Sequence, residues 1–177
     1  YTLSLHDALP ILLRQLNSDR ILIFTRTKHR ARNLAHKLEI EGFRTSALQG
    51  NMSQNQRQGA LDGFRKGKYD ILVATDIAAR GIDVTDISHV INFDMPDTVD
   101  AYIHRIGRTG RAQATGKAFT FCVADDGGMI RNIEKVLGTK NERERLPGFD
   151  YGTRSPGRHP QKNSRNQPRH KIGRENV

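Results

Sequence analysis

Three arginines at intervals of three residues form the most chemically distinctive stretch of this 177-residue chain. They are Arg105, Arg108 and Arg111, in the string Tyr-Ile-His-Arg-Ile-Gly-Arg-Thr-Gly-Arg that begins at Tyr102. The spacing would place them along one stripe of a helix, but the two glycines between them indicate that the helix ends here. Guanidinium is planar, forked and permanently charged, which suits phosphate oxygens. The sequence therefore predicts a helix end that directs guanidiniums at a phosphate. The alternative is a solvated basic turn.

Two further polar stretches follow apolar runs. Thr75 comes directly after the run Ile71–Ala74, and Gly50 follows a shorter run that ends at Leu48. Ser53 then has the spacing of a helix cap, with Gln56 as its capping-box partner. Ligands of parallel sheets collect outside the carboxyl ends of the strands. These stretches therefore have the right place in the sequence to bind a ligand.

The elements that must position these residues can be predicted from periodicity. Continuous apolar runs predict strands buried on both faces, whereas apolar residues at i, i+3, i+4 and i+7 predict amphipathic helices. We expect five strands, near 21–24, 44–48, 71–74, 89–93 and 118–123. We expect helices ending near 16, from 27 to Gly42, after Ser53, after Asp97 as the cap, and over 129–137. Alternating strands and helices indicate an α/β layered sandwich with a largely parallel sheet.

The charge balance favours a polyanionic partner. The chain has 29 Lys and Arg against 19 Asp and Glu, for a net charge of +10. The last 28 residues carry half of this excess and almost no apolar side chains, so we expect a disordered basic tail that attracts RNA or serves only for solubility. A single cysteine, Cys122, excludes an internal disulfide. No run is long enough to span a membrane, and we expect a cytoplasmic protein.

Several catalytic motifs are absent from the sequence. Gly110 to Lys117 has the wrong length for a phosphate-binding P-loop and lacks its final hydroxyl residue. No Asp-Glu-Ala-Asp string follows a strand, and His104 has no second metal ligand at suitable spacing. We therefore expect no metal site and no ATP hydrolysis by this chain alone.

Taken together, the motifs resemble the C-terminal RecA-like domain of DEAD-box ATP-dependent RNA helicases of superfamily 2. The arginine string, the stretch from Ala74 to Val84, the stretch from Leu48 to Arg57 and the string from Ile23 to Lys28 occur in the family's order. The last of these, with the basic tail, resembles the bacterial RhlE-like branch. Gln49 stands where the family usually has His, which puts any protonation-linked role in doubt.

This resemblance implies roles for individual residues. It makes Arg108 and Arg111 arginine fingers that reach the γ-phosphate, and it makes His104 and Arg105 contacts between domains. Gly81 and Asp83 would bind the nucleotide, the latter through a ribose hydroxyl. The residues implied to bind RNA are Thr25, Gly50, Arg57 and Thr75.

The same resemblance implies a chain that works with a second lobe. That N-terminal RecA-like lobe would hold ATP and its Mg²⁺, and RNA would bind across both lobes through its backbone. The alternatives are a stand-alone RNA-binding module without ATPase activity and a lobe of a DNA helicase. His104 at the head of the arginine string favours RNA over DNA.

The expected domain organisation has three parts. Residues 1–10 resemble a translated sequencing-adapter segment and are expected to be a non-native or disordered leader. Residues 11–146 would form the helicase domain, and residues 147–177 the basic tail. On this hypothesis the natural protein continues upstream and the chain is a fragment.

Overall fold

Five parallel strands form the centre of the computed structural model, which describes residues 5–16, 20–80, 87–109, 116–147 and 149. The strands lie in the order β2-β3-β1-β4-β5, and every neighbouring pair is parallel. Their bounds are β1 Ile21–Phe24, β2 Thr45–Leu48, β3 Ile71–Ala74, β4 His89–Asn92 and β5 Lys117–Thr120. This confirms the predicted α/β architecture with a parallel sheet.

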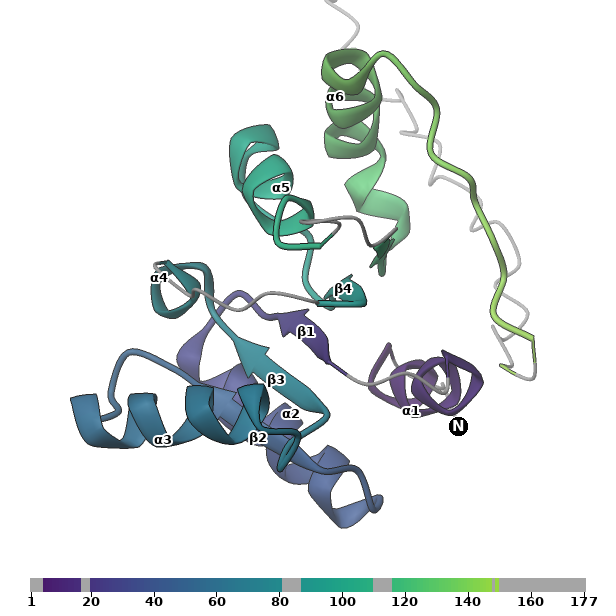
Figure 1. Cartoon of the computed structure of the whole chain (residues 1–177). Coiled ribbons are helices and arrows are strands. Elements are labelled where there is room, and N and C mark those ends of the chain that lie inside the picture. Colours follow the sequence, from purple (N-terminus) through teal and green to yellow (C-terminus); the bar gives the residue numbers. More distant parts are fainter. Residues whose placement is uncertain (1–4, 17–19, 81–86, 110–115, 148, 150–177) are drawn as a thin grey trace, which may run out of the picture.

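Six α-helices and one 3-10 turn accompany the sheet in the described part of the chain (Figure 1). The helices are α1 Leu5–Leu16, α2 Lys28–Ile40, α3 Gln54–Arg65, α4 Asp76–Ala79, α5 Val99–Ile106 and α6 Gly127–Leu137, and the 3-10 turn spans Ala124–Asp126. Consecutive parallel strands need such crossover connections, because a tight hairpin can join only antiparallel strands.

Both faces of the central strands are buried, which explains why they are continuous apolar runs. In β1, Ile21 and Ile23 pack with α1 and α2, whereas Leu22 and Phe24 pack on the opposite face with α3 and α4. The alternation follows from the two-residue period of a strand. The central strands of the sheet therefore lie between two layers of helices, which leaves their ends, rather than their faces, open to a ligand.

A third, smaller cluster joins α5 to α6. Met95, Tyr102 and Ile133 form its buried part. Figure 1 shows these two helices side by side, with the segment after α6 returning toward α1. The return is fixed where the Gln15 amide donates to the carbonyl of Pro147 at 3.2 Å, and Leu146 packs against the core.

Most element boundaries were predicted within a few residues, and the capping box at Ser53 is confirmed in both of its hydrogen bonds. One predicted cap is wrong. Thr98, rather than Asp97, caps α5, because its hydroxyl accepts the backbone N–H of Ala101 at 3.1 Å. Asp97 instead pairs with Arg26 at 3.4 Å.

Residues 5–10, which were expected to belong to a non-native or disordered leader, are helical in the structure. They belong to α1, where Ala8 and Leu9 are 3% and 0% exposed and Leu9 joins the core beside Ile21. The apolar side chains of this segment belong to the stripe of α1 that packs against one face of the sheet. Residues 1–4 and 150–177, with most of the predicted tail, lie outside the described residues.

Candidate nucleic-acid and nucleotide interface

The strand ends bring three of the predicted motifs to one edge of the sheet. In the register, Ala74 is paired with both Leu48 and Phe24, the last residues of the neighbouring strands. Thr75, Gln49 and Thr25 therefore leave the sheet side by side. Parallel strands place their following loops at the same edge, so these segments form one surface from three separate parts of the sequence.

Thr75 has a hydroxyl that the helix it precedes does not use. It is the N-cap residue of α4, in an extended conformation with φ −98° and ψ 159°, yet its side chain makes no capping hydrogen bond. An N-cap threonine normally accepts from the first turn of its helix. Only 8% of Thr75 is exposed, so the hydroxyl lies at the floor of this edge rather than projecting from it.

The loop after β2 is open and firmly anchored. A Cβ added at Gly50 would meet no atom within 4 Å, so the backbone there is accessible to a ligand. The capping box at Ser53 fixes the start of α3, and Arg57 follows in its first turns. The Arg57 guanidinium donates to the carbonyl of Ala78 at 3.2 Å, which joins α3 to α4. Arg57 is therefore held at this edge while part of its side chain remains exposed.

Thr25 differs from the other residues predicted to bind RNA. It is 0% exposed, and its hydroxyl donates to the carbonyl of Thr27 at 3.3 Å. Thr27 itself caps α2 by accepting the N–H of Arg30. An RNA contact by the Thr25 side chain would require this turn to open, and the turn hydrogen bond is the role that the structure shows for it.

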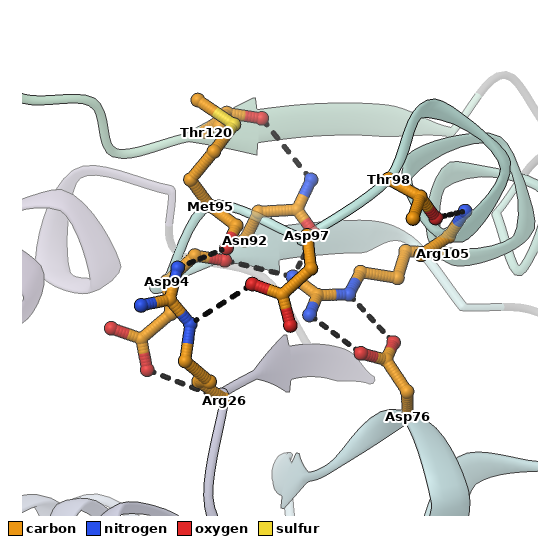
Figure 2. A network of polar contacts seen from close by, with 10 residues as sticks. Arg26, Asp76, Asn92, Asp94, Met95, Asp97, Thr98, Arg105 and Thr120 are labelled. Atoms are coloured by element: carbon orange, nitrogen blue, oxygen red, sulfur yellow. Dashed lines mark hydrogen bonds and ion pairs between the residues drawn. The ribbon is translucent and has the colours of Figure 1, made fainter. Parts of the chain in front are cut away.

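Arg105, for which an interdomain role was predicted, lies buried within its own lobe, and the interdomain role stays a prediction. Only 2% of Arg105 is exposed, and its guanidinium holds both carboxylate oxygens of Asp76 at 2.7 Å (Figure 2). It also donates to the carbonyl of Asp94 at 2.8 Å and to the amide oxygen of Asn92 at 3.3 Å. These bonds hold the Arg105 guanidinium in the interior of its own lobe, where it joins the start of α4 to the end of β4 and the segment that follows.

The network around Arg105 contains residues to which sequence analysis assigned no role. Asp76 starts α4, directly after Thr75, Asn92 ends β4, and Asp94 lies two residues beyond it. The Asn92 amide continues the network to the hydroxyl of Thr120 on β5 at 3.1 Å. Figure 2 shows Arg105 pointing between these strand ends. Asp76 lies within the motif that was singled out, so its position was visible in the sequence, but its partner 29 residues away was not.

Arg26 forms a second link between the strand ends. Its guanidinium donates to the carbonyl of Met95 at 3.2 Å, and its backbone N–H donates to the carboxylate of Asp94 at 2.8 Å. Arg30 pairs with the same carboxylate at 2.9 Å. The segments after β1 and β4 are thus held together by charged hydrogen bonds, which stiffens the edge on which the motifs lie.

Arg108 lies in a different setting from Arg105. The helix α5 ends at Ile106 with Gly107 as its cap, as the sequence predicted, and Arg108 follows half-buried. The backbone N–H of Arg108 donates to the carbonyl of Arg105 at 3.1 Å, and the Thr109 hydroxyl donates to the carbonyl of Ile87 at 2.9 Å. His104 is exposed on α5. Gly81, Asp83 and Arg111 lie outside the described residues.

Two side chains have pKa values that the fold displaces. Burial lowers the pKa of His89, and the charge of Lys117 lowers it further. Burial raises the pKa of the Cys122 thiol, the nearby Asp126 carboxylate raises it further, and Arg143 opposes both. Neither residue belongs to the edge that carries the motifs.

Within the described ranges, no group of three or more His, Cys, Asp or Glu side chains is placed to hold a metal ion. None of the helices described is long and apolar enough to cross a membrane.

The helicase conserved C-terminal domain family matches residues 4–113 of the chain. The DEAD-box ATP-dependent RNA helicase CshA of Bacillus subtilis is 41% identical over 144 residues, which cover 81% of this chain and 29% of CshA. The pre-mRNA-splicing helicase PRP28 of Pyricularia oryzae is 42% identical over 127 residues, which cover 72% and 19% of the two chains. The chain thus spans less than a third of the length of these two relatives.

Solved structures agree with this comparison. The Escherichia coli DEAD-box protein SrmB, solved in complex with the regulator of ribonuclease activity A, superposes with a TM-score of 0.72 at 39% identity. The match covers 77% of this chain and 81% of that one. The chain belongs to the helicase conserved C-terminal domain family, and it has the RecA-like fold of the C-terminal domain of DEAD-box RNA helicases.

Proposed function

We propose that this chain is the second lobe of an ATP-dependent RNA helicase, which binds RNA backbone and supplies arginine fingers to ATP held by a neighbouring lobe. The observation that supports this most is the convergence of Thr75, Gly50 and Arg57 on one edge of the sheet. A hydroxyl, an open backbone and a guanidinium are the groups that contact sugar and phosphate, so the proposed binding has little sequence preference.

The nucleotide would meet the same lobe at the end of α5. Arg108 provides a guanidinium beyond the helix end, and Arg111, Gly81 and Asp83 are the further residues that the family resemblance assigns to ATP. The residues described provide no cluster of carboxylates for Mg²⁺, so the proposal assigns the metal and the phosphate-binding loop to the neighbouring lobe. Bound ATP supplies the free energy for lobe closure, and this chain contributes charge to its terminal phosphate.

The buried Arg105 network gives this arrangement its rigidity. It ties the start of α4, which follows Thr75, to the helix that leads to Arg108. RNA at Thr75 and phosphate at Arg108 would therefore act on two ends of one connected unit. We propose that closure of the two lobes on ATP and RNA moves this unit as a whole, a hinge-type transition. A cytoplasmic location belongs to the same proposal.

The experiment is an Arg108→Ala substitution in a chain that includes the ATPase lobe. We expect RNA-stimulated ATP hydrolysis to fall by about 10³–10⁵, the range for loss of an arginine finger, while RNA binding without nucleotide is retained. Lys135→Ala, on the exposed side of α6, is the control and should change neither quantity. Near-normal turnover of the Arg108 variant would contradict the finger role.

RNA binding is tested separately on the same protein. Arg57→Ala should weaken binding to all RNA sequences alike and lower the slope of log affinity against log salt by about 0.7, the value for one phosphate contact on a single strand. A stand-alone RNA-binding module would show the same loss of RNA binding, but it would hydrolyse no ATP either with or without RNA. A sequence-dependent loss would contradict backbone recognition.

A further inference from the structure

A basic cavity lies beside the motif edge, between α2 and α3. It has a volume of about 590 Å³, and its lining includes Lys28, His29 and Arg32 from α2 and Lys68 from the segment before β3. No Asp or Glu contributes to the lining. A neighbouring cavity of about 500 Å³ also contains Arg32 but is lined by Glu39 as well, so the unbalanced positive charge is confined to the first.

The remaining lining of the cavity combines polar and aromatic side chains with Met52, Gly59 and Ala60. Gln49, Asn51 and Gln56 contribute side-chain amides, of which the Gln56 oxygen already accepts the N–H of Ser53, and Tyr69 contributes a half-buried ring with the Lys68 ammonium 5.3 Å from its centroid. The ring occupies space that any side chain at position 63 would fill, because a Cβ on Gly63 would lie 2.5 Å from a carbon of that ring. Amides that pair with base edges and an aromatic ring that stacks, combined with cations for phosphate, are the groups that bind single-stranded nucleotides.

The cavity is continuous with the loop that carries Gly50. Gln49 and Asn51 flank Gly50 and line the cavity, and Lys28 donates to the amide oxygen of Asn51 at 3.1 Å. A strand whose backbone crosses the open loop would therefore reach the cavity with its next nucleotides. An acidic peptide would match the charge, but the apolar side chains of the lining are limited to Met52 and Ala60, which is little to anchor the side chains of a peptide.

We propose that this cavity binds nucleotides of single-stranded RNA that continue past the motif edge, with phosphates on Arg32 and Lys68 and a base against Tyr69. The inference rests on the proposed function, since the strand must first lie on the edge formed by Gly50 and Thr75. It extends the RNA path from the carboxyl edge of the sheet to the outer side of β2, and it assigns RNA contacts to residues outside the recognised motifs.

The test uses a double substitution and a matched control, both made in a chain that includes the ATPase lobe. Arg32→Gln with Lys68→Gln removes two cations from the cavity. The control, Lys37→Gln with Lys66→Gln, removes the same amount of charge. Both lysines are exposed, one on α2 and one in the segment before β3, and neither lines the cavity. Each protein is titrated with single-stranded RNAs lengthened one nucleotide at a time, at several salt concentrations, and its melting temperature is compared with that of the unsubstituted chain.

The expected result is specific to long RNA. In the unsubstituted chain, affinity rises as added nucleotides enter the cavity, and the cavity variant should lose only this gain. Its salt slope for long RNA should fall by about 1.4, which corresponds to two phosphate contacts on a single strand. The control should keep the gain from added length.

The outcomes separate the cavity from the proposed function. If Arg57→Ala weakens binding at every length while the cavity variant matches its control, the cavity proposal is overturned and RNA binding at the motif edge stands. If both double variants lose the same affinity, the effect is one of general charge and the cavity has no role. If the chain binds no RNA at all, both proposals fail.

Discussion

Arg105 and Arg108 lie three residues apart in the same motif, and the fold places them in opposite settings. Arg105 is 2% exposed and holds Asp76 with two hydrogen bonds, whereas Arg108 lies half-buried beyond the end of α5. A guanidinium group suits either setting, because its planar, forked donors can pair with a buried carboxylate or with a phosphate. Identical residues in one motif can therefore differ in burial, and under the proposed function Arg105 would build the site while Arg108 operates it.

The largest stability effect should come from breaking the buried pair. Asp76→Ala leaves the Arg105 guanidinium without its carboxylate, and loss of one partner from a buried pair costs about 3–5 kcal/mol in the free energy of unfolding. Because 42% of the Asp76 side chain is exposed, we expect the lower end of this range. Urea denaturation of the chain measures it.

A second substitution sharpens this test. Adding Arg105→Met to Asp76→Ala removes the stranded charge, so the double variant should recover part of the lost stability, as buried pairs replaced by apolar groups often do. A double variant less stable than Asp76→Ala alone would show that the bonds of Arg105 to Asn92 and Asp94 matter more than its ion pair.

The start of α5 provides a smaller contrast within the same region. Thr98→Ala removes the helix cap and should destabilise the chain by about 1 kcal/mol. Asp97→Ala should change stability by less than about 0.5 kcal/mol, since the pair that it forms with Arg26 is exposed on both sides. The same denaturation assay compares the two, and a larger loss for the Asp97 variant would restore it as the functional cap.

The smallest expected effect concerns His89, whose charge changes with pH, in contrast to the permanent charge of the arginines. Burial lowers the pKa of His89 in the folded chain below its unfolded value of 6.5, so protonation favours the unfolded state. The stability that neutral His89 contributes is intact above pH 6.5 and is lost as the pH falls from there through the lower pKa of the folded state. A His89→Gln variant should show a shallower decline on acidification. A parallel decline in both proteins would mean that His89 contributes nothing to it.

The sequence could predict the features that depend on local pattern. Residues such as Ile71–Ala74 are apolar throughout because both faces of β3 are covered, so the strand was located to the residue. Ser53 and Gln56 carry their capping signal within four positions. The helix α4 was not predicted, because four residues are too few to show a helical period.

The features that the sequence did not predict depend on distant partners. Arg105 looks like any other arginine of its motif, and only the folded chain brings Asp76, Asn92 and Asp94 around it. Thr25 has a near partner, the carbonyl of Thr27, but its complete burial likewise depends on the folded chain. Side-chain burial of a polar residue is decided by tertiary packing, which periodicity does not encode.

The most direct test of the division between Arg105 and Arg108 is one pair of substitutions in two assays. Arg105→Gln and Arg108→Gln are made in a chain that includes the ATPase lobe, and unfolding of this domain and RNA-stimulated ATP hydrolysis are measured for both. We predict that Arg105→Gln lowers the free energy of unfolding by about 3 kcal/mol, whereas Arg108→Gln, at a half-buried position, lowers it by less and abolishes hydrolysis. Equal losses of stability in the two variants, or an active Arg108 variant, would contradict the account.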